Sequence, residues 1–155
     1  MDNPFMARAI QLSIENVRSE RGGPFGAVVV KGDAVIAEAT NQVTSSNDPT
    51  AHAEVLAIRD ACQRLGVFDL QECEIYTSCE PCPMCLGAIY WARIARVYFA
   101  NSAADASKIG FDDSLIYREL AQPHSQRRIP MTQIMRKEAS AAFREWEDRS
   151  NKIAY

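Results

Sequence analysis

The sequence predicts an α/β protein, a three-layer α/β/α sandwich around a mixed five-stranded sheet. Two short apolar runs, 25–30 and 34–39, are joined by Lys31-Gly32-Asp33, which is typical of a β-hairpin. Two further runs, 74–78 and 96–100, are separated by a segment long enough for a helix, which favours a right-handed crossover between parallel strands. Helices are predicted before, between and after these strands, so they would cover both faces of the sheet.

The first helix is predicted from its capping residues. Asp2 or Asn3 can cap its N-terminus, and Pro4 suits its opening turn. An apolar stripe at helical spacing follows, formed by Met6, Ile10, Ile14 and Val17. The turn-forming segment 21–24, Arg-Gly-Gly-Pro, is predicted to end this helix before the hairpin.

A second helix is predicted after the hairpin. Asp48 is suited to be its N-cap, and Pro49 is suited to its first helical position. This start places His52 and Glu54 on the first turn. Gly66 is predicted to end the helix.

A third helix is predicted to begin near Cys82 and to end at about Arg93. Pro81 and Pro83 are tolerated where a helix opens but not in its interior, so the cysteines belong to the first turn. Because Cys82 and Cys85 are three positions apart, both sulfur atoms would lie on one face of the helix.

The rest of the chain has weaker patterns. We expect a helix over 112–121, the fifth strand over 129–135 and a last helix over 140–149. A chain of 155 residues with 47% hydrophobic content is long enough for one domain with a continuous core and too short for two comfortable domains. The sequence therefore predicts a single domain spanning 1–155.

Composition indicates which classes of partner the protein binds and in which cellular compartment it works. Seventeen basic and twenty acidic residues give a net charge of −3, which does not favour a nucleic-acid-binding protein. The N-terminal segment 1–20 is interrupted by charges, and the longest apolar stretch, 84–92, is too short to cross a membrane. Five cysteines are an odd number and do not predict a disulfide framework. We expect a cytoplasmic protein.

Two short motifs carry the chemistry, His52-Ala53-Glu54 and Pro81-Cys82-Pro83-Met84-Cys85. One imidazole and two thiolates make three metal ligands, and a catalytic zinc site keeps three protein ligands and an open position for water. Glu54 is placed to act as a proton shuttle to that water. The combination H-x-E with P-C-x-x-C is an established signature of zinc-dependent nucleobase deaminases, so hydrolytic deamination of a heterocycle is predicted.

Several alternatives accompany this interpretation. Cys79 precedes Cys82 by three positions and could serve as a fourth ligand, which would close the open position. The zinc could also be purely structural in a non-catalytic interaction module, although Glu54 argues against that. Phe25 and Asn41 offer an aromatic face and an amide for a flat base, but such residues are also common in cores and turns.

The chain resembles the cytidine deaminase-like superfamily and, within it, the short zinc-dependent guanine deaminases of bacteria. The superfamily resemblance rests on the two motifs above. The resemblance to the subfamily rests on five segments: Gly22-Gly23-Pro24-Phe25-Gly26-Ala27, Ser46-Asn47-Asp48-Pro49-Thr50-Ala51-His52-Ala53-Glu54, Thr77-Ser78-Cys79-Glu80-Pro81-Cys82, Gly110-Phe111-Asp112-Asp113-Ser114 and Asn151-Lys152-Ile153-Ala154-Tyr155. It implies one zinc ion per subunit and hydrolysis of guanine to xanthine and ammonia. A transfer-RNA adenosine deaminase, or a deaminase of cytosine or another nucleobase, is the alternative.

The resemblance also implies roles for individual residues. Asp113 would contact the amino and ring N–H edge of the base, while Asn41 and the backbone at Ala53 contact its other edge. Phe25 would pack on the ring, with Trp91 nearby. The resemblance further implies a homodimer in which about 138–155 crosses to the partner, so that Tyr155 closes the other subunit's site.

Overall fold

Four strands form one mixed sheet in the order β2–β1–β3–β4. The hairpin strands β1 (Gly26–Lys31) and β2 (Ala34–Thr40) are antiparallel, and β1 is also antiparallel to β3 (Glu74–Cys79). β3 and β4 (Arg96–Asn101) are parallel, which confirms both the predicted hairpin and the predicted crossover. The computed structural model describes residues 3–155 and comprises two compact units, Met1–Asp113 and Ser114–Tyr155.

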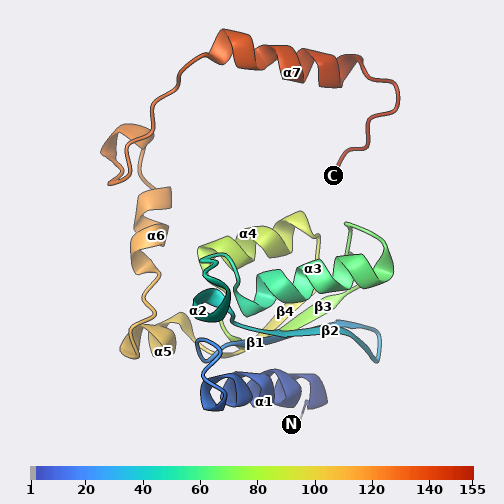
Figure 1. Ribbon diagram of the computed structural model, residues 1–155, viewed down its shortest axis with the longest axis vertical. Helices are drawn as coiled ribbons and strands as arrows, with labels where there is room; N and C mark the ends of the chain where they lie inside the picture. The colour runs from blue at the N-terminus through green and yellow to red at the C-terminus, as the bar shows by residue number, and fades with distance from the viewer. Residues whose placement is uncertain (1–2) are drawn as a thin grey trace. The chain divides into compact units, whose positions relative to one another are not determined.

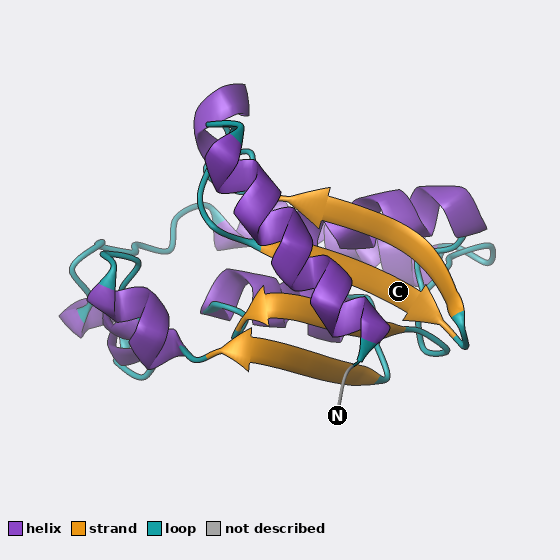
Figure 2. Ribbon diagram, turned by 90° about the horizontal axis from the view of Figure 1, so that it is seen from below, coloured by secondary structure: helices purple, strands orange, loops and turns teal. Residues whose placement is uncertain are grey.

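The sheet lies between two layers of helices in the first unit (Figures 1 and 2). Alternate residues of β1 face opposite sides, as the period of two in a strand requires. Ala27 and Val29 belong to the core under α3 (Ala53–Leu65) and α4 (Pro83–Trp91), whereas Val28 and Val30 belong to the core under α1 (Pro4–Arg18). The three-layer α/β/α arrangement is therefore confirmed, with all four of these β1 side chains buried.

The first helix, α1, begins as predicted but buries a different face. The Asn3 side chain caps it by accepting a hydrogen bond from Met6 N at 2.9 Å, and Asp2 lies outside the described residues. Three residues of the predicted apolar stripe are exposed, namely Ile10, Ile14 and Val17. The buried face is formed instead by Ala9, Leu12, Ser13 and Asn16. This face is buried because α1 approaches the sheet closely at Gly26, which has no Cβ. A Cβ on Gly26 would lie only 2.5 Å from Ala9 O.

The helix that follows the hairpin, α3, begins later than predicted. Asp48 is not its N-cap: its Oδ1 accepts hydrogen bonds from Thr50 N at 2.8 Å and from Thr50 Oγ1 at 2.7 Å, which closes a local turn. His52 is the N-cap, and Glu54 lies in the first turn. A short helix, α2 (Val43–Ser46), precedes this turn, and α3 ends at Gly66 with a positive φ of 68°, as predicted.

The helix of the crossover, α4, is confirmed. Cys82 is its N-cap and Pro83 is its first residue, so the helix opens where the prolines allow it. After β4 the chain forms α5 (Ala103–Lys108), which the sequence did not predict. A capping box between Ser102 and Asp105 begins this helix.

The second unit contains no strand among the described residues, so the predicted five-stranded sheet is corrected to four strands. It consists of α6 (Ser114–Leu120), the 3₁₀-helix η1 (His124–Gln126) and α7 (Arg136–Asp148). The segment 129–135 was expected to be the fifth strand. Pro130 removes a backbone donor there, and Met135 has a positive φ of 51°, neither of which suits a paired strand. Within residues 3–155 no helix is both long and apolar enough to span a membrane.

Candidate metal centre

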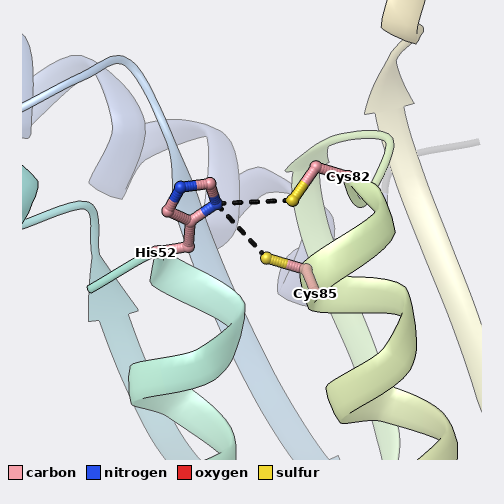
Figure 3. Close-up of side chains that lie close together, drawn as sticks. All are labelled: His52, Cys82 and Cys85. Carbon is pink, nitrogen blue, oxygen red and sulfur yellow. Dashed lines mark hydrogen bonds between the residues drawn. The ribbon is translucent and has the colours of Figure 1, made fainter. Parts of the chain in front are cut away.

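Three predicted ligands, His52, Cys82 and Cys85, converge in the first unit (Figure 3). Their ligand atoms all lie within 4.8 Å of one another. His52 Nδ1 lies 3.5 Å from Cys82 Sγ and 3.4 Å from Cys85 Sγ. The imidazole thus faces both sulfur atoms through Nδ1.

These distances fit a zinc ion. Zinc–sulfur bonds of about 2.3 Å and zinc–nitrogen bonds of about 2.0 Å, at a tetrahedral angle, place nitrogen and sulfur about 3.5 Å apart. The separations of His52 from Cys82 and Cys85 match that value without any movement of the side chains. The donor set of one imidazole and two thiols also suits zinc, and three ligands leave one tetrahedral position open.

Both metal-binding segments lie where a helix begins. His52 caps α3 and Cys82 caps α4, and neither side chain makes a capping hydrogen bond. The partial positive charge of two helix N-termini favours thiolates at this point. A hydrogen bond from the Cys85 thiol also lowers the pKa of the Cys82 thiol to about 4. Cys82 is therefore prepared to bind a cation.

The carboxyl group of Glu54 lies buried beside this cluster, with 8% of the residue exposed. Burial raises the pKa of Glu54, and the negative charge of Cys82 adds to that effect. Glu54 is not one of the three converging ligands. Its carboxyl group thus lies next to the metal position and is not part of the ligand set.

Cys79 does not join the cluster of converging ligands. Its Sγ donates to Ser102 O at 3.7 Å, and burial raises the pKa of this thiol to about 11. The alternative of a fourth thiolate ligand is not supported by this geometry. Cys79 instead ties the end of β3 to the start of α5.

Asn41 and Phe25 lie side by side at the ends of the hairpin strands. Asn41 N donates to Phe25 O at 3.0 Å, and the next residue, Gln42, donates from N to Ala51 O at 2.9 Å. Asn41 is 6% exposed and Phe25 is half-buried. These bonds bring both candidate base-binding residues next to the segment that carries His52.

The other predicted base-binding residues divide between the two units. Ala53 is fully buried as the first residue of α3, and Asp113 ends the first unit. Burial raises the pKa of Asp113, and the negative charge of Cys82 adds to that effect. Tyr155 belongs to the second unit. Trp91 is the last residue of α4, about 13 Å of helix away from Cys82.

Two further residues at the site were not predicted. The Phe111 ring packs edge-on against Phe25, with ring centroids 4.9 Å apart and planes at 87°. Asn16 is 2% exposed and donates from Nδ2 to the backbone of Asn41. A polar residue on the sheet-facing side of α1 was the available signal for Asn16, but it required the correct buried face.

Comparison with known proteins places the chain in a family. Residues 1–101 match the model of the cytidine and deoxycytidylate deaminase zinc-binding region. The chain is 54% identical over 151 residues to the guanine deaminase of Bacillus subtilis, which covers 97% of each protein. The X-ray structure of guanine deaminase from Bacillus subtilis superposes with a TM-score of 0.96 at 53% identity, covering 100% of this chain and 99% of that one.

More distant relatives share the same architecture. A guanine deaminase structure from Nitrosomonas europaea has a TM-score of 0.68 at 32% identity and covers 94% of this chain and 85% of that one. The tRNA-specific adenosine deaminase of Aquifex aeolicus is 39% identical over 123 residues, 79% of each protein. With the three ligands in place for one metal ion, the chain is a zinc-dependent hydrolase of the cytidine and deoxycytidylate deaminase family, and it is homologous to bacterial guanine deaminase.

Proposed function

We propose that this protein removes the amino group of guanine by hydrolysis, giving xanthine and ammonia. The observation that carries the proposal is the convergence of His52, Cys82 and Cys85 beside the buried carboxyl group of Glu54. The homology to guanine deaminases directs the choice of base. When bound, one zinc ion per chain acidifies a water ligand toward a pKa of about 7 and so supplies a nucleophile at neutral pH.

Glu54 moves the protons of the reaction. It accepts the proton of the attacking water and delivers it to a ring nitrogen of the base as the carbon–oxygen bond forms. The second proton passes from the newly added hydroxyl group through Glu54 to the amino group, so the carbon–nitrogen bond breaks and ammonia leaves. A carbonyl group then stands where the amino group was. Burial of Glu54 keeps bulk water from competing for these protons.

Asn41 and Asp113 give the base its orientation in this proposal. Asn41 Oδ1 accepts hydrogen bonds from Gly23 N at 3.3 Å and from Val43 N at 3.2 Å, so the Asn41 side chain presents its Nδ2 donors to the base. Asp113 accepts from the amino and ring N–H edge of guanine, because a carboxylate offers only acceptors. Cytosine and adenine lack that edge.

Phe25 and Ala53 complete the base site. The Phe25 ring is held edge-on by Phe111 and provides an apolar face for a flat purine. Ala53 offers its backbone at the N-terminus of α3, where no side chain caps the helix. The ring face of Phe25 suits a flat base, and the backbone N–H groups at the start of α3 can donate to an acceptor on its edge.

A substrate panel tests the proposal. The zinc-loaded protein is incubated with guanine, adenine, cytosine, guanosine and a transfer RNA, and ammonia release is measured. We expect turnover of guanine, with each other substrate at least about 100-fold slower, because each leaves a buried polar group unpaired or adds a ribose. Absence of ammonia from guanine would contradict the proposed function, and faster release from transfer RNA would favour the alternative.

We also infer a homodimer in which the segment of about 138–155 crosses to the partner, so that Tyr155 covers the partner's base site. The second unit supports this inference because its last helix and tail expose large apolar side chains, including Phe143, Ile153 and Tyr155. Such surfaces normally pack against another protein surface. We expect the enzyme to work in the cytoplasm, where its five free cysteines stay reduced.

A further inference from the structure

The helix α1 carries a buried amide whose donors cross to the loops of the base site. Asn16 is 2% exposed. Its Nδ2 donates to Gly23 O at 2.8 Å and to Asn41 O at 2.9 Å. Both acceptors are backbone carbonyls, so the two donors of one amide join two segments that are far apart in the sequence.

Those two segments depend on each other for their conformation. A Cβ on Gly22 would lie 2.2 Å from Asn41 O, so the glycine allows the loop and the end of β2 to approach closely. Asn41 Oδ1 then accepts from Gly23 N and Val43 N. Among residues 3–155, no hydrogen bond consumes the Nδ2 donors of Asn41. The loop contacts therefore fix which end of this amide faces the base.

Phe25 is held by the same loop. Gly23 O, which accepts from Asn16, also accepts from Phe25 N at 2.8 Å. Asn41 N in turn donates to Phe25 O at 3.0 Å. Movement of Gly23 would thus displace the aromatic face of the base site together with its amide.

The Oδ1 atom of Asn16 helps to explain why an amide occupies this buried position. Asn16 Oδ1 is buried and has no hydrogen-bond partner within residues 3–155. An unpaired buried oxygen is unfavourable, and an apolar residue of similar size would avoid that penalty. Such a residue would provide no donors for the carbonyls of Gly23 and Asn41. The amide at this position is therefore explained by its two donors.

We propose that Asn16 is a positioning residue for base recognition, which acts through Asn41 and Phe25 without touching the base. This inference rests on the proposed function, because it takes Asn41 and Phe25 as base-binding residues. We expect loss of its donors to leave zinc binding and the proton shuttle in place, because the metal ligands and Glu54 lie at the N-termini of α3 and α4 and not on α1. We expect the loss of these donors to weaken binding of the base.

Steady-state kinetics of Asn16→Ala test the proposal. We expect KM for guanine to rise about 10-fold or more, with kcat within about 3-fold of wild type, because binding contacts are displaced while the reacting groups are not. Zinc content should stay at one ion per chain. Ser13→Ala is the matched control, since Ser13 is also buried on α1 but its hydroxyl group donates to Ile10 O of its own helix. Its KM should match wild type.

Two measurements separate positioning from a structural role. In a double-mutant cycle, Asn16→Ala should raise KM much less when Asn41 is already alanine, because the residue acts through Asn41. In the free protein, hydrogen exchange of the Gly23 and Val43 amides should be faster in Asn16→Ala. A lower melting temperature with unchanged KM would assign Asn16 to stability alone and overturn the proposal.

Asn16→Leu provides a second variant with similar side-chain volume, in case the alanine variant does not fold. It removes both donors and the unpaired Oδ1 together, so we expect the same rise in KM at higher stability than Asn16→Ala. An unchanged KM in a folded Asn16→Leu would overturn the inference. Failure of the proposed function is seen separately, because the wild-type protein itself would then release no ammonia from guanine.

Discussion

We predict that replacing Glu54 separates metal binding from turnover. Glu54→Gln keeps the size and burial of the side chain but cannot accept or deliver the proton. We predict an unchanged zinc content and a kcat for guanine that is lower by about 10²–10⁴-fold, the usual contribution of a positioned acid–base group. Metal analysis combined with an ammonia assay checks both parts. Full activity of Glu54→Gln would rule out the shuttle role.

The three cysteines near the site provide a matched comparison. Cys82→Ala and Cys85→Ala each remove one of three ligands, so we predict that the purified variants hold much less than one zinc ion per chain. Cys79→Ala removes a thiol that bonds to Ser102 O outside the cluster, and its zinc content should equal that of wild type. Zinc loss in Cys79→Ala would show that the ligand set is wrong.

Candidate site residues that lie in short sequence motifs could be predicted from the sequence. Residues whose role depends on contacts with distant parts of the chain could not. His52, Glu54, Cys82 and Cys85 were identified because zinc chemistry demands those residue types in short motifs. Asn16 was missed, because its role depends on an acceptor 25 positions away, at the end of β2.

At the scale of elements, the close contact between α1 and β1 gives a stability prediction. A Cβ on Gly26 would lie 2.5 Å from Ala9 O and 2.8 Å from Leu12 Cβ. We predict that Gly26→Ala lowers the free energy of unfolding by about 1–3 kcal/mol, the typical cost of overpacking. Urea denaturation measures this change.

Gly87 is the control for that prediction. It lies within α4, and a Cβ there would meet nothing within 4 Å. Gly87→Ala should therefore be neutral or raise the free energy of unfolding by up to about 1 kcal/mol, because alanine favours the helix. Equal effects of Gly26→Ala and Gly87→Ala would contradict the proposed packing of α1 against the sheet.

Element types were easier to predict than element boundaries and faces. The start of α3 was placed at Asp48 because an Asp-Pro pair suits a helix start, but the Asp48 side chain closes a turn with Thr50 instead. The apolar face of α1 was predicted from Met6, Ile10, Ile14 and Val17, of which Met6 packs against the core and the other three are exposed. The helix approaches the sheet most closely at Gly26, where the strand has no Cβ, and this is a property of the strand that the helical pattern does not reveal.

At the scale of the whole molecule, the prediction of three layers was confirmed and the prediction of a fifth strand was wrong. Strands β1 to β4 are encoded by local apolar runs, which a turn or predicted helices separate. The segment 129–135 has a strand-like composition, but a strand also needs a partner edge, which composition does not supply. It lies in the second unit, where Ile129 and Ile134 are exposed.

The role proposed for the second unit predicts the effect of a truncation. Removing residues 151–155 deletes Tyr155 but no metal ligand, so zinc content should stay at one ion per chain. We predict that KM for guanine rises at least about 10-fold, because an aromatic cover over the base is lost. A Tyr155→Phe variant, which keeps the ring, is the control. Unchanged KM after truncation would refute the role of Tyr155 as a cover.

The central claim is that the His52–Cys82–Cys85 centre, with Glu54, adds water to guanine. It is tested most directly by turnover in ¹⁸O-labelled water, followed by mass spectrometry of the purine product. The account predicts xanthine that carries one labelled oxygen at the former amino position, with one ammonia released per xanthine, and no product from Glu54→Gln. Unlabelled xanthine, or no xanthine from the zinc-loaded wild-type protein, would contradict it.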